Sequence, residues 1–332
     1  MRLQTILITM MTVITALTSC QRSAKLELRL PSRYDGKQVE LISYMDSSVV
    51  ATSMVRDGVA MIETSEGDSL RFPVFMQVVV DGRTRAYYVA EEGEAVMNDS
   101  SSYITGTPMN DLLAGLMSQL DSIEDTDDMN AYIEFAEKQY NANIDNPIGA
   151  YFGVEWMKFA EPASIDSMLS KASPEFRDSR RVKMYEKMAK HRLATSPGVK
   201  YIDFEGEDSR GHALKLSQLM VKGKYTIIDF WASWCPYCIK ELPELKRLRS
   251  ELGEKVEIIG VAVRDIPNDT RAMVKKQEIG WPVLYNTGRL PYNIYGFTGI
   301  PHHILVDPDG VIVSRGESAA QLYERILQIE NK

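Results

Sequence analysis

Two cysteines separated by two residues follow an apolar run and open a helical pattern. Cys235 and Cys238 come after the largely apolar run 227–231, and from residue 239 onward apolar residues recur at helical spacing. Cys235 is therefore expected at a helix N-terminus, where unpaired N–H groups and the helix dipole stabilise a thiolate. Cysteines in that setting have pKa values lowered from about 8.5 to roughly 3.5–7.5. Because Cys238 lies one turn further along the same side of the helix, the pattern predicts a dithiol exchange site.

Two other roles for such a pair fit this sequence less well. A zinc site usually needs four ligands, but the only other cysteine is Cys20, and the four histidines show no metal-ligand spacing with the pair. A static structural disulfide across two residues would restrict the unfolded chain little. We therefore predict no metal site, and no cofactor apart from the redox-active Cys235–Cys238 disulfide itself.

The segment 229–238 resembles the active-site segment of the thioredoxin superfamily. The longer C-terminal part, 197–332, is similar to the TlpA/ResA-like branch of thiol-disulfide oxidoreductases. The dipeptide between the cysteines, Pro236-Tyr237, departs from the Gly-Pro of thioredoxins. Glutaredoxins use Pro-Tyr, and a strongly oxidising relative uses Pro-His, so this dipeptide bears on the redox potential.

The resemblance implies roles for further residues. Asp229, six positions before Cys235, matches the buried acid of thioredoxins. Since burial disfavours a charged carboxylate, we expect Asp229 to hold a proton and to exchange it with Cys238. Ile300-Pro301 matches the cis-proline loop of the family, whose backbone would pair with an extended substrate segment. The expected substrate-binding residues are Trp234, Pro236, Tyr237, Ile300 and Pro301.

Composition narrows the class of protein. The chain has 332 residues and a net charge of −8, with neither a basic patch nor interleaved aromatic and basic residues, which argues against nucleic acid as a partner. With 44% hydrophobic and 25% charged residues it is ordinary globular material. Three cysteines are too few for a disulfide scaffold. Their placement leaves no spare thiol to misoxidise, which suits an oxidising compartment.

The N-terminus predicts export and a lipid anchor. Arg2 precedes the largely apolar run 3–17, which is too short for a comfortable membrane span and typical of a signal peptide. The following Leu17-Thr18-Ser19-Cys20 resembles a bacterial lipobox, which implies acylation of Cys20 and durable anchoring by several acyl chains. An ordinary signal peptide with a chance cysteine is the alternative. Because no acidic cluster follows Cys20, we expect a lipoprotein of the bacterial cell envelope that faces the periplasm.

The next part of the chain has the pattern of short β-strands. Residues 25–30 alternate, and residues 74–80 and 86–89 form the best hairpin. Asp-Gly turn dipeptides recur at 35–36, 57–58 and 81–82. We therefore predict a small antiparallel β-sandwich. Segments 88–93 and 105–110 resemble a domain of unknown function that often precedes TlpA-like domains, for which binding or spacing is the expected role.

Helical spacing of apolar residues begins near residue 110. We predict helices at 129–140, at 147–159 and, in two pieces, between 162 and 193, with Ser164 and Ser173 as helix starts. Aromatic residues at helical spacing usually mean burial, so we place four of them in the core: Tyr151, Phe152, Trp156 and Phe159.

The C-terminal domain alternates strands and helices, which predicts a mixed α/β sheet with helices on both faces, and the resemblance implies that this fold is thioredoxin-like. The predicted strands are 200–204, 225–231, 256–263, 281–285, 303–306 and 311–315. The predicted helices are 214–219, 237–251, 269–278, 290–296 and 319–329. An extra helix and strand between 268 and 285 match the insertion of TlpA-like proteins.

These elements divide the chain into five parts. Ser196-Pro197-Gly198 marks the boundary before the catalytic domain. The parts are a lipoprotein signal peptide at 1–19, an anchor or linker at 20–24, a β-rich domain at 25–107, a helical segment at 108–196 and the thioredoxin-like domain at 197–332.

The leading interpretation is a membrane-anchored periplasmic thiol-disulfide oxidoreductase. Cys235 attacks a disulfide in an envelope protein, and Cys238 resolves the mixed disulfide. Asp229 and the TlpA/ResA resemblance favour the reductase direction, with a membrane thiol reductase as the electron donor. Potentials in this superfamily span about −270 to −120 mV, so a disulfide oxidase or isomerase with the same site is the alternative enzyme.

Two further functions that would use the same cysteines fit the sequence less well. A peroxidase would need a Thr-x-x-Cys context, which the sequence lacks. A copper carrier would use Cys235, Cys238 and His303 as ligands. Adjacent histidines in a strand, His302 and His303, point opposite ways, however, and this arrangement supplies a closed metal site poorly.

Overall fold

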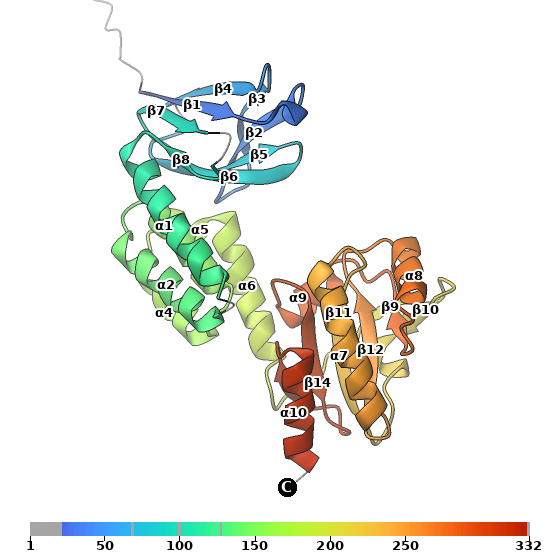
Figure 1. Cartoon of the computed structure of the whole chain (residues 1–332). Helices are drawn as coiled ribbons and strands as arrows, with labels where there is room; N and C mark the ends of the chain where they lie inside the picture. The colour runs from blue at the N-terminus through green and yellow to red at the C-terminus, as the bar shows by residue number, and fades with distance from the viewer. Residues whose placement is uncertain (1–21, 68–69, 99–100, 127, 331–332) are drawn as a thin grey trace, which may run out of the picture. The chain divides into compact units, whose positions relative to one another are not determined.

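The computed structural model describes residues 22–67, 70–98, 101–126 and 128–330 (Figure 1). The lipobox and Cys20 lie outside the described residues. The chain divides into two compact units, one formed by the residues up to 128 together with 142–151, the other by 129–141 and 152 to the end. Within the described ranges, no helix combines the length and the apolar character that a membrane crossing requires.

The first unit contains two four-stranded sheets around one core. One sheet has the order β4-β1-β7-β8, with bounds Val59–Ser65, Ser23–Arg29, Gly93–Met97 and Ile104–Thr105. The other has the order β3-β2-β5-β6, with bounds Val49–Met54, Gln38–Ser43, Val74–Val80 and Arg83–Ala90. Alternate residues of the strands, such as Leu26 and Leu28 or Val39 and Leu41, are buried between the sheets.

The predicted sandwich is confirmed, with one difference in strand direction. β1 pairs with β7 in parallel, whereas every other strand pair of the two sheets is antiparallel. Only neighbouring strands joined by a tight turn must be antiparallel, and a long stretch of chain separates β1 from β7. The predicted hairpin of β5 and β6 turns at Asp81-Gly82, where both residues have positive φ (52° and 74°), as a type I′ turn requires.

Six helices follow among the described residues: α1 (Pro108–Glu124), α2 (Met129–Ala142), α3 (Pro147–Met157), α4 (Pro162–Lys171), α5 (Pro174–Asp178) and α6 (Arg180–Ala194). Three of the predicted core aromatics, Tyr151, Phe152 and Trp156, are buried, and Phe159 is half-buried.

Two predictions about these helices were wrong. The stretch 162–193 forms three pieces rather than two, because Ser173 and Ser179 each begin a new helix, accepting hydrogen bonds from the N–H groups of Phe176 and Val182. Ser164 does not begin a helix. Pro162 already occupies the first helical position, where its missing N–H is no loss.

The second unit contains a five-stranded mixed sheet of order β13-β12-β11-β14-β15. The bounds in that order are Val283–Leu284, Val256–Ala262, Tyr225–Trp231, His302–Val306 and Ile312–Arg315. The central β11 runs parallel to β12 and antiparallel to β14. The helices of this domain are α7 (Pro236–Leu252), α8 (Pro267–Lys276), α9 (Leu290–Tyr295) and α10 (Ala319–Glu330).

The sheet is covered on both faces, as predicted (Figure 1). On one face, Leu242 and Leu245 of α7 and Leu322 of α10 pack in one core cluster with Ile227 and Leu305 of the strands. On the other face, tyrosines of α9 pack with residues of the opposite parity, which are Ile228, Phe230 and Ile304. The alternation along β11 and β14 therefore decides which side chains point toward α7.

The start of this domain differs from the prediction. No strand forms at 200–204; Lys200 makes only an isolated bridge to Val311. Instead β9 (Glu205–Glu207) pairs with β10 (Ala213–Lys215), and a single 3₁₀ turn, Leu216–Gln218, replaces the predicted helix 214–219. Asp203 accepts a local hydrogen bond from the backbone N–H of Phe204, and it also accepts from the backbone N–H and hydroxyl of Ser217; such side-chain bonds compete with strand pairing.

Candidate active site

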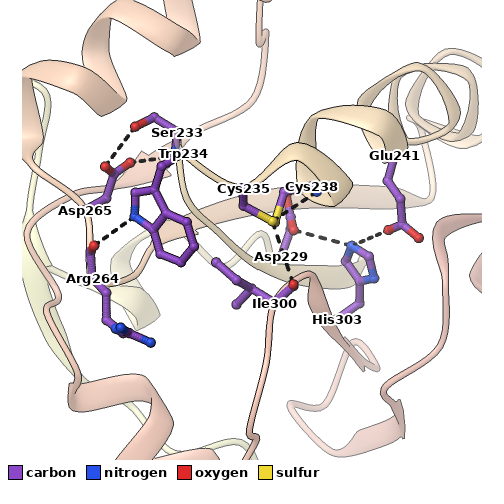
Figure 2. Close-up of a disulfide and its surroundings, with 10 residues drawn as sticks. All are labelled: Asp229, Ser233, Trp234, Cys235, Cys238, Glu241, Arg264, Asp265, Ile300 and His303. Atoms are coloured by element: carbon purple, nitrogen blue, oxygen red, sulfur yellow. Dashed lines mark hydrogen bonds and ion pairs between the residues drawn. A yellow bond between two sulfur atoms is a disulfide. The ribbon is translucent and has the colours of Figure 1, made fainter. Parts of the chain in front are cut away.

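Cys235 and Cys238 form a disulfide at the N-terminus of α7 (Figure 2). Their Cα atoms are 5.3 Å apart. Cys235 is the residue that caps the helix, and its Sγ accepts a hydrogen bond of 3.1 Å from the backbone N–H of Cys238. The order strand, cysteine pair, helix is therefore as predicted. The N–H group that contacts Sγ is one that would stabilise a thiolate on Cys235.

The disulfide is recessed below exposed side chains. Cys235 and Cys238 are 2% and 3% exposed, whereas Trp234 and Tyr237 are 53% and 69% exposed. Pro236 is also exposed. These side chains, predicted to contact substrate, therefore form the outer surface that a large substrate would meet before it reached sulfur.

The loop before β14 lies on the other side of Cys235. The carbonyl oxygen of Ile300 is 3.7 Å from Cys235 Sγ, and the Ile300–Pro301 peptide bond is cis, as predicted. A thiol on Cys235 could donate to this carbonyl. The structure thus brings Ile300 and Pro301 together with the cysteine pair.

Asp265 holds the loop that carries Trp234 through hydrogen bonds. Its carboxylate accepts hydrogen bonds from the backbone N–H of Ser233 (2.7 Å), the Ser233 hydroxyl (2.8 Å) and the Thr270 hydroxyl (2.8 Å). The indole N–H of Trp234 donates to the carbonyl of Arg264 at 3.0 Å (Figure 2). Sequence reasoning missed Asp265. The available signal was its position just after β12, because parallel β11 and β12 end at the same edge of the sheet.

Three titratable side chains lie close together beneath the cysteine pair, which we term the buried acid–histidine cluster: Asp229, Glu241 and His303 (Figure 2). The Nε2 atom of His303 lies 3.3 Å from Asp229 Oδ1 and 3.4 Å from Glu241 Oε2. The side chains of His303, Asp229 and Glu241 are 2%, 4% and 25% exposed. Asp229 was predicted to be buried, whereas its two neighbours were not predicted to reach it.

The cluster faces α7 because of strand register. Asp229 on β11 is the direct antiparallel partner of His303 on β14, and both have the parity of the residues that pack against α7. Glu241 follows Cys238 by three residues, so the two share one side of that helix. The cluster and the cysteine pair therefore lie in the same layer, between the sheet and α7.

The hydrogen bonds of His303 indicate that the cluster shares a proton. Its Nδ1 lies 2.9 Å from the backbone carbonyl of Glu317, and since a carbonyl only accepts, Nδ1 carries hydrogen. In a neutral ring with hydrogen on Nδ1, Nε2 carries no hydrogen, and its lone pair would then face the carboxylate oxygens. Two acceptors in contact repel, so either His303 is an imidazolium or one of the two acids is protonated.

Electrostatics place the proton within this group. Burial lowers the pKa of His303, but the hydrogen bond and charge of Asp229, the charge of Glu241 and the Glu317 carbonyl outweigh burial, so that this pKa is raised. Burial raises the pKa of Glu241, and the charge of Asp229 raises it further, while His303 opposes the rise. Both shifts favour keeping a proton in the cluster.

The two adjacent histidines point to opposite faces, as predicted. The ring of His302 stacks on Phe297 with centroids 4.8 Å apart, and its Nε2 is near Arg315. Both nitrogens of His303 are directed to oxygen atoms rather than to the cysteine sulfurs. Across the described part of the chain, no group of three or more His, Cys, Asp or Glu side chains has an arrangement that could hold a metal ion.

Comparisons with known proteins match the part of the chain that contains this site. The family model described as AhpC/TSA matches residues 197–315. Thiol-disulfide oxidoreductase ResA of Halalkalibacterium halodurans is 27% identical over 148 residues, which are 44% of this chain and 83% of that protein. A ResA of Bacillus cereus is 31% identical over 129 residues, 38% of this chain and 73% of that protein. The solution structure of a thiol:disulfide interchange protein from Bacteroides sp. is 26% identical and covers 42% of this chain and 93% of that one, with a TM-score of 0.38.

Proposed function

The chain belongs to the ResA-like thiol-disulfide oxidoreductases, and we propose that it reduces disulfides in proteins of the bacterial cell envelope. The observation that carries this proposal is the placement of Cys235 Sγ on the N–H of Cys238 at the start of α7, above a buried cluster that holds a proton. One sulfur is set up as a nucleophile, and the second is placed beside groups that can take its proton.

The reaction proceeds in two exchange steps. In the dithiol form, the Cys235 thiolate attacks one sulfur of the substrate disulfide; a mixed disulfide forms and the first substrate thiolate leaves and takes a proton. Cys238 then loses its proton and attacks Cys235 Sγ, which releases the second substrate thiolate. Two electrons pass from the enzyme dithiol to the substrate, and the Cys235–Cys238 disulfide remains.

The buried acid–histidine cluster supports the second step. Cys238 is 3% exposed, so its proton needs an acceptor inside the protein. Asp229 and His303 lie on the face of the sheet that α7 covers, and Glu241 extends from the same side of α7 as Cys238. We assign to Asp229 the exchange of this proton, and to His303 and Glu241 the positioning of the Asp229 carboxyl group.

A redox titration of the Cys235–Cys238 couple against glutathione tests the direction. A reductase should have a reduction potential toward the thioredoxin end of the range, about −270 mV, whereas an oxidant should have a potential of about −120 mV. The exposed Pro236-Tyr237 dipeptide is the observation that favours the oxidase or isomerase alternative. A measured potential near the oxidising end would replace our proposal with that alternative.

The location and partners belong to the same proposal. The Leu17-Thr18-Ser19-Cys20 segment supports a lipid anchor at Cys20 and a position facing the periplasm. A reductase in that compartment must be rereduced after each turnover, and we propose a membrane thiol reductase as its electron donor. The β-rich N-terminal domain would then serve binding or spacing.

A further inference from the structure

A cavity of about 340 Å³ in the second unit has five basic side chains among its described lining residues, the others being uncharged, and we term it the basic cavity. Helix α6 forms one wall and the thioredoxin-like fold forms the other. The basic residues that line it are Arg180, Lys187 and His191 of α6, with Arg264 and Arg289 from the loops after β12 and before α9. None of the described residues that line it is acidic.

The cations of the cavity differ from those on the remainder of α6. Lys183 and Lys190, which do not line the cavity, pair with Asp178 and Glu186. Within the ranges that the structure describes, no carboxylate lies within ion-pair distance of Arg180, Lys187 or Arg264. Like charges gathered in a concave site create a strong local potential for an anion.

The two walls are held together by the end of α6. The guanidinium of Arg315 donates to the backbone carbonyls of Arg192 (3.2 Å) and Thr195 (3.1 Å). Gly296, at the end of α9, lies so close to α6 that a Cβ atom there would be 2.2 Å from the carbonyl oxygen of Met188. The cavity is therefore built between two elements in direct contact.

The cavity adjoins the redox site through two segments. Arg264, which has φ +51°, contributes its side chain to the cavity and its carbonyl to the indole N–H of Trp234. Its guanidinium carbon lies 5.8 Å from the centre of the Trp234 ring, which flanks Cys235 (Figure 2). On the second side, Thr298 lines the cavity two residues before Ile300, the residue beside Cys235 Sγ.

We propose that the basic cavity binds an acidic stretch of the polypeptide whose disulfide is exchanged at Cys235, an inference that rests on the proposed function. A substrate segment extended along residues 298–300 advances about 3.3 Å per residue, so Asp or Glu side chains a few residues from its cysteine would reach the cavity. Arginine guanidinium groups bind carboxylates with two parallel hydrogen bonds, which suits Arg180, Arg264 and Arg289 to this ligand. The continuity with the segments beside Cys235 favours a polypeptide over a free anion.

The test compares two synthetic peptides that share one disulfide and differ in a short flanking segment, rich in Asp and Glu in one and in Asn and Gln in the other. The full-length chain is compared with Arg180→Glu/Lys187→Glu. The matched control is Lys183→Glu/Lys190→Glu, which reverses the same number of charges on the same helix outside the cavity. Measurements are kcat/KM for both peptides and the potential of the Cys235–Cys238 couple.

We expect the cavity variant to lose roughly three- to tenfold in kcat/KM for the acidic peptide, because charges at a binding site act on association and specificity. The neutral peptide, the redox potential and the control variant should change by less than about twofold, since exposed pairs such as those of Lys183 and Lys190 contribute little.

Equal losses for both peptides, an equal loss in the control, or no loss would overturn the proposal. If inorganic phosphate binds in the cavity but kcat/KM is equal for the acidic and the neutral peptide, the cavity is a small-anion site and the proposal is wrong. A wild-type chain that exchanges with neither peptide would instead refute the proposed function.

Discussion

His303 on β14 faces Asp229 on β11 across directly paired strand positions, with Nε2 3.3 Å from Oδ1. Both side chains are almost fully buried, so neither is in contact with bulk solvent. A buried carboxylate is tolerated when a positive or hydrogen-bonding group compensates it, and the imidazole supplies that compensation. This contact gives the family's buried acid a titratable partner and makes the site sensitive to pH.

His303→Gln should destabilise the protein by roughly 2–4 kcal/mol at pH 6, because the change leaves two acids in a buried site without their partner. The raised pKa of His303 means that its contribution is fully present below the unfolded value of about 6.5 and is lost as pH rises through the folded value. Urea unfolding at several pH values should show that the difference in free energy of unfolding between wild type and His303→Gln becomes smaller above about pH 6.5. A gap independent of pH would show that His303 only fills space.

Asp229→Asn should slow resolution of the mixed disulfide by roughly tenfold or more, because an amide at this position cannot exchange a proton with Cys238. Initial attack by Cys235 should change much less, since the helix N-terminus stabilises that thiolate. Stopped-flow measurements with separate readouts for formation and decay of the mixed disulfide would distinguish the steps. Equal slowing of both would leave Asp229 a structural role only. Because Asp229 contacts His303, we expect a modest loss of stability for this variant.

Cys238→Ser should trap substrate proteins on Cys235, and Cys235→Ser should trap few or none. The reason is that Cys235 caps α7 and receives the N–H of Cys238, whereas Cys238 lies within the helix. Non-reducing electrophoresis of extracts, followed by identification of the trapped proteins, would show the difference. Faster alkylation of Cys238 than of Cys235 in the reduced protein at near-neutral pH would reverse the assignment.

Asp265→Ala should lower the rate of substrate reduction and destabilise the protein by roughly 1–3 kcal/mol, because it leaves the N–H and the hydroxyl of Ser233 without their acceptor. Asp269→Ala is the matched control, since Asp269 lies exposed in the first turn of α8. Thermal unfolding and kcat/KM check both variants. Partial rescue by Asp265→Asn, which keeps one acceptor oxygen, would support a positioning role. A rate unchanged from wild type would contradict it.

Cys20→Ala should release the protein from the membrane fraction or block its processing, because the acylated residue would be lost. Fractionation of cells and the mass of the mature protein provide the measurement. Membrane attachment and mass identical to wild type would show that Leu17-Thr18-Ser19-Cys20 does not function as a lipobox.

Local patterns in the sequence were sufficient for the elements around the cysteine pair. The apolar run before Cys235 and the helical spacing after Cys238 predicted β11 and α7 to within a residue, since the period of a hydrophobic pattern can be read from consecutive residues. Asp81-Gly82 likewise located the turn of the hairpin. The boundaries went wrong where side chains accept hydrogen bonds from nearby backbone N–H groups, as Asp203 does from Phe204 and Ser179 does from Val182.

The sequence by itself determined which residues could exchange disulfides: a cysteine pair at a helix start, an acid six positions before it and an Ile-Pro loop. Only the tertiary structure decided what surrounds them. His303 reaches Asp229 because of the register of β14 on β11, and Asp265 reaches Ser233 because β11 and β12 end at one edge of the sheet. The basic cavity exists because α6 packs beside α9. These contacts join residues distant in the chain, and pairing of that kind follows from the packing of whole elements rather than from any local spacing.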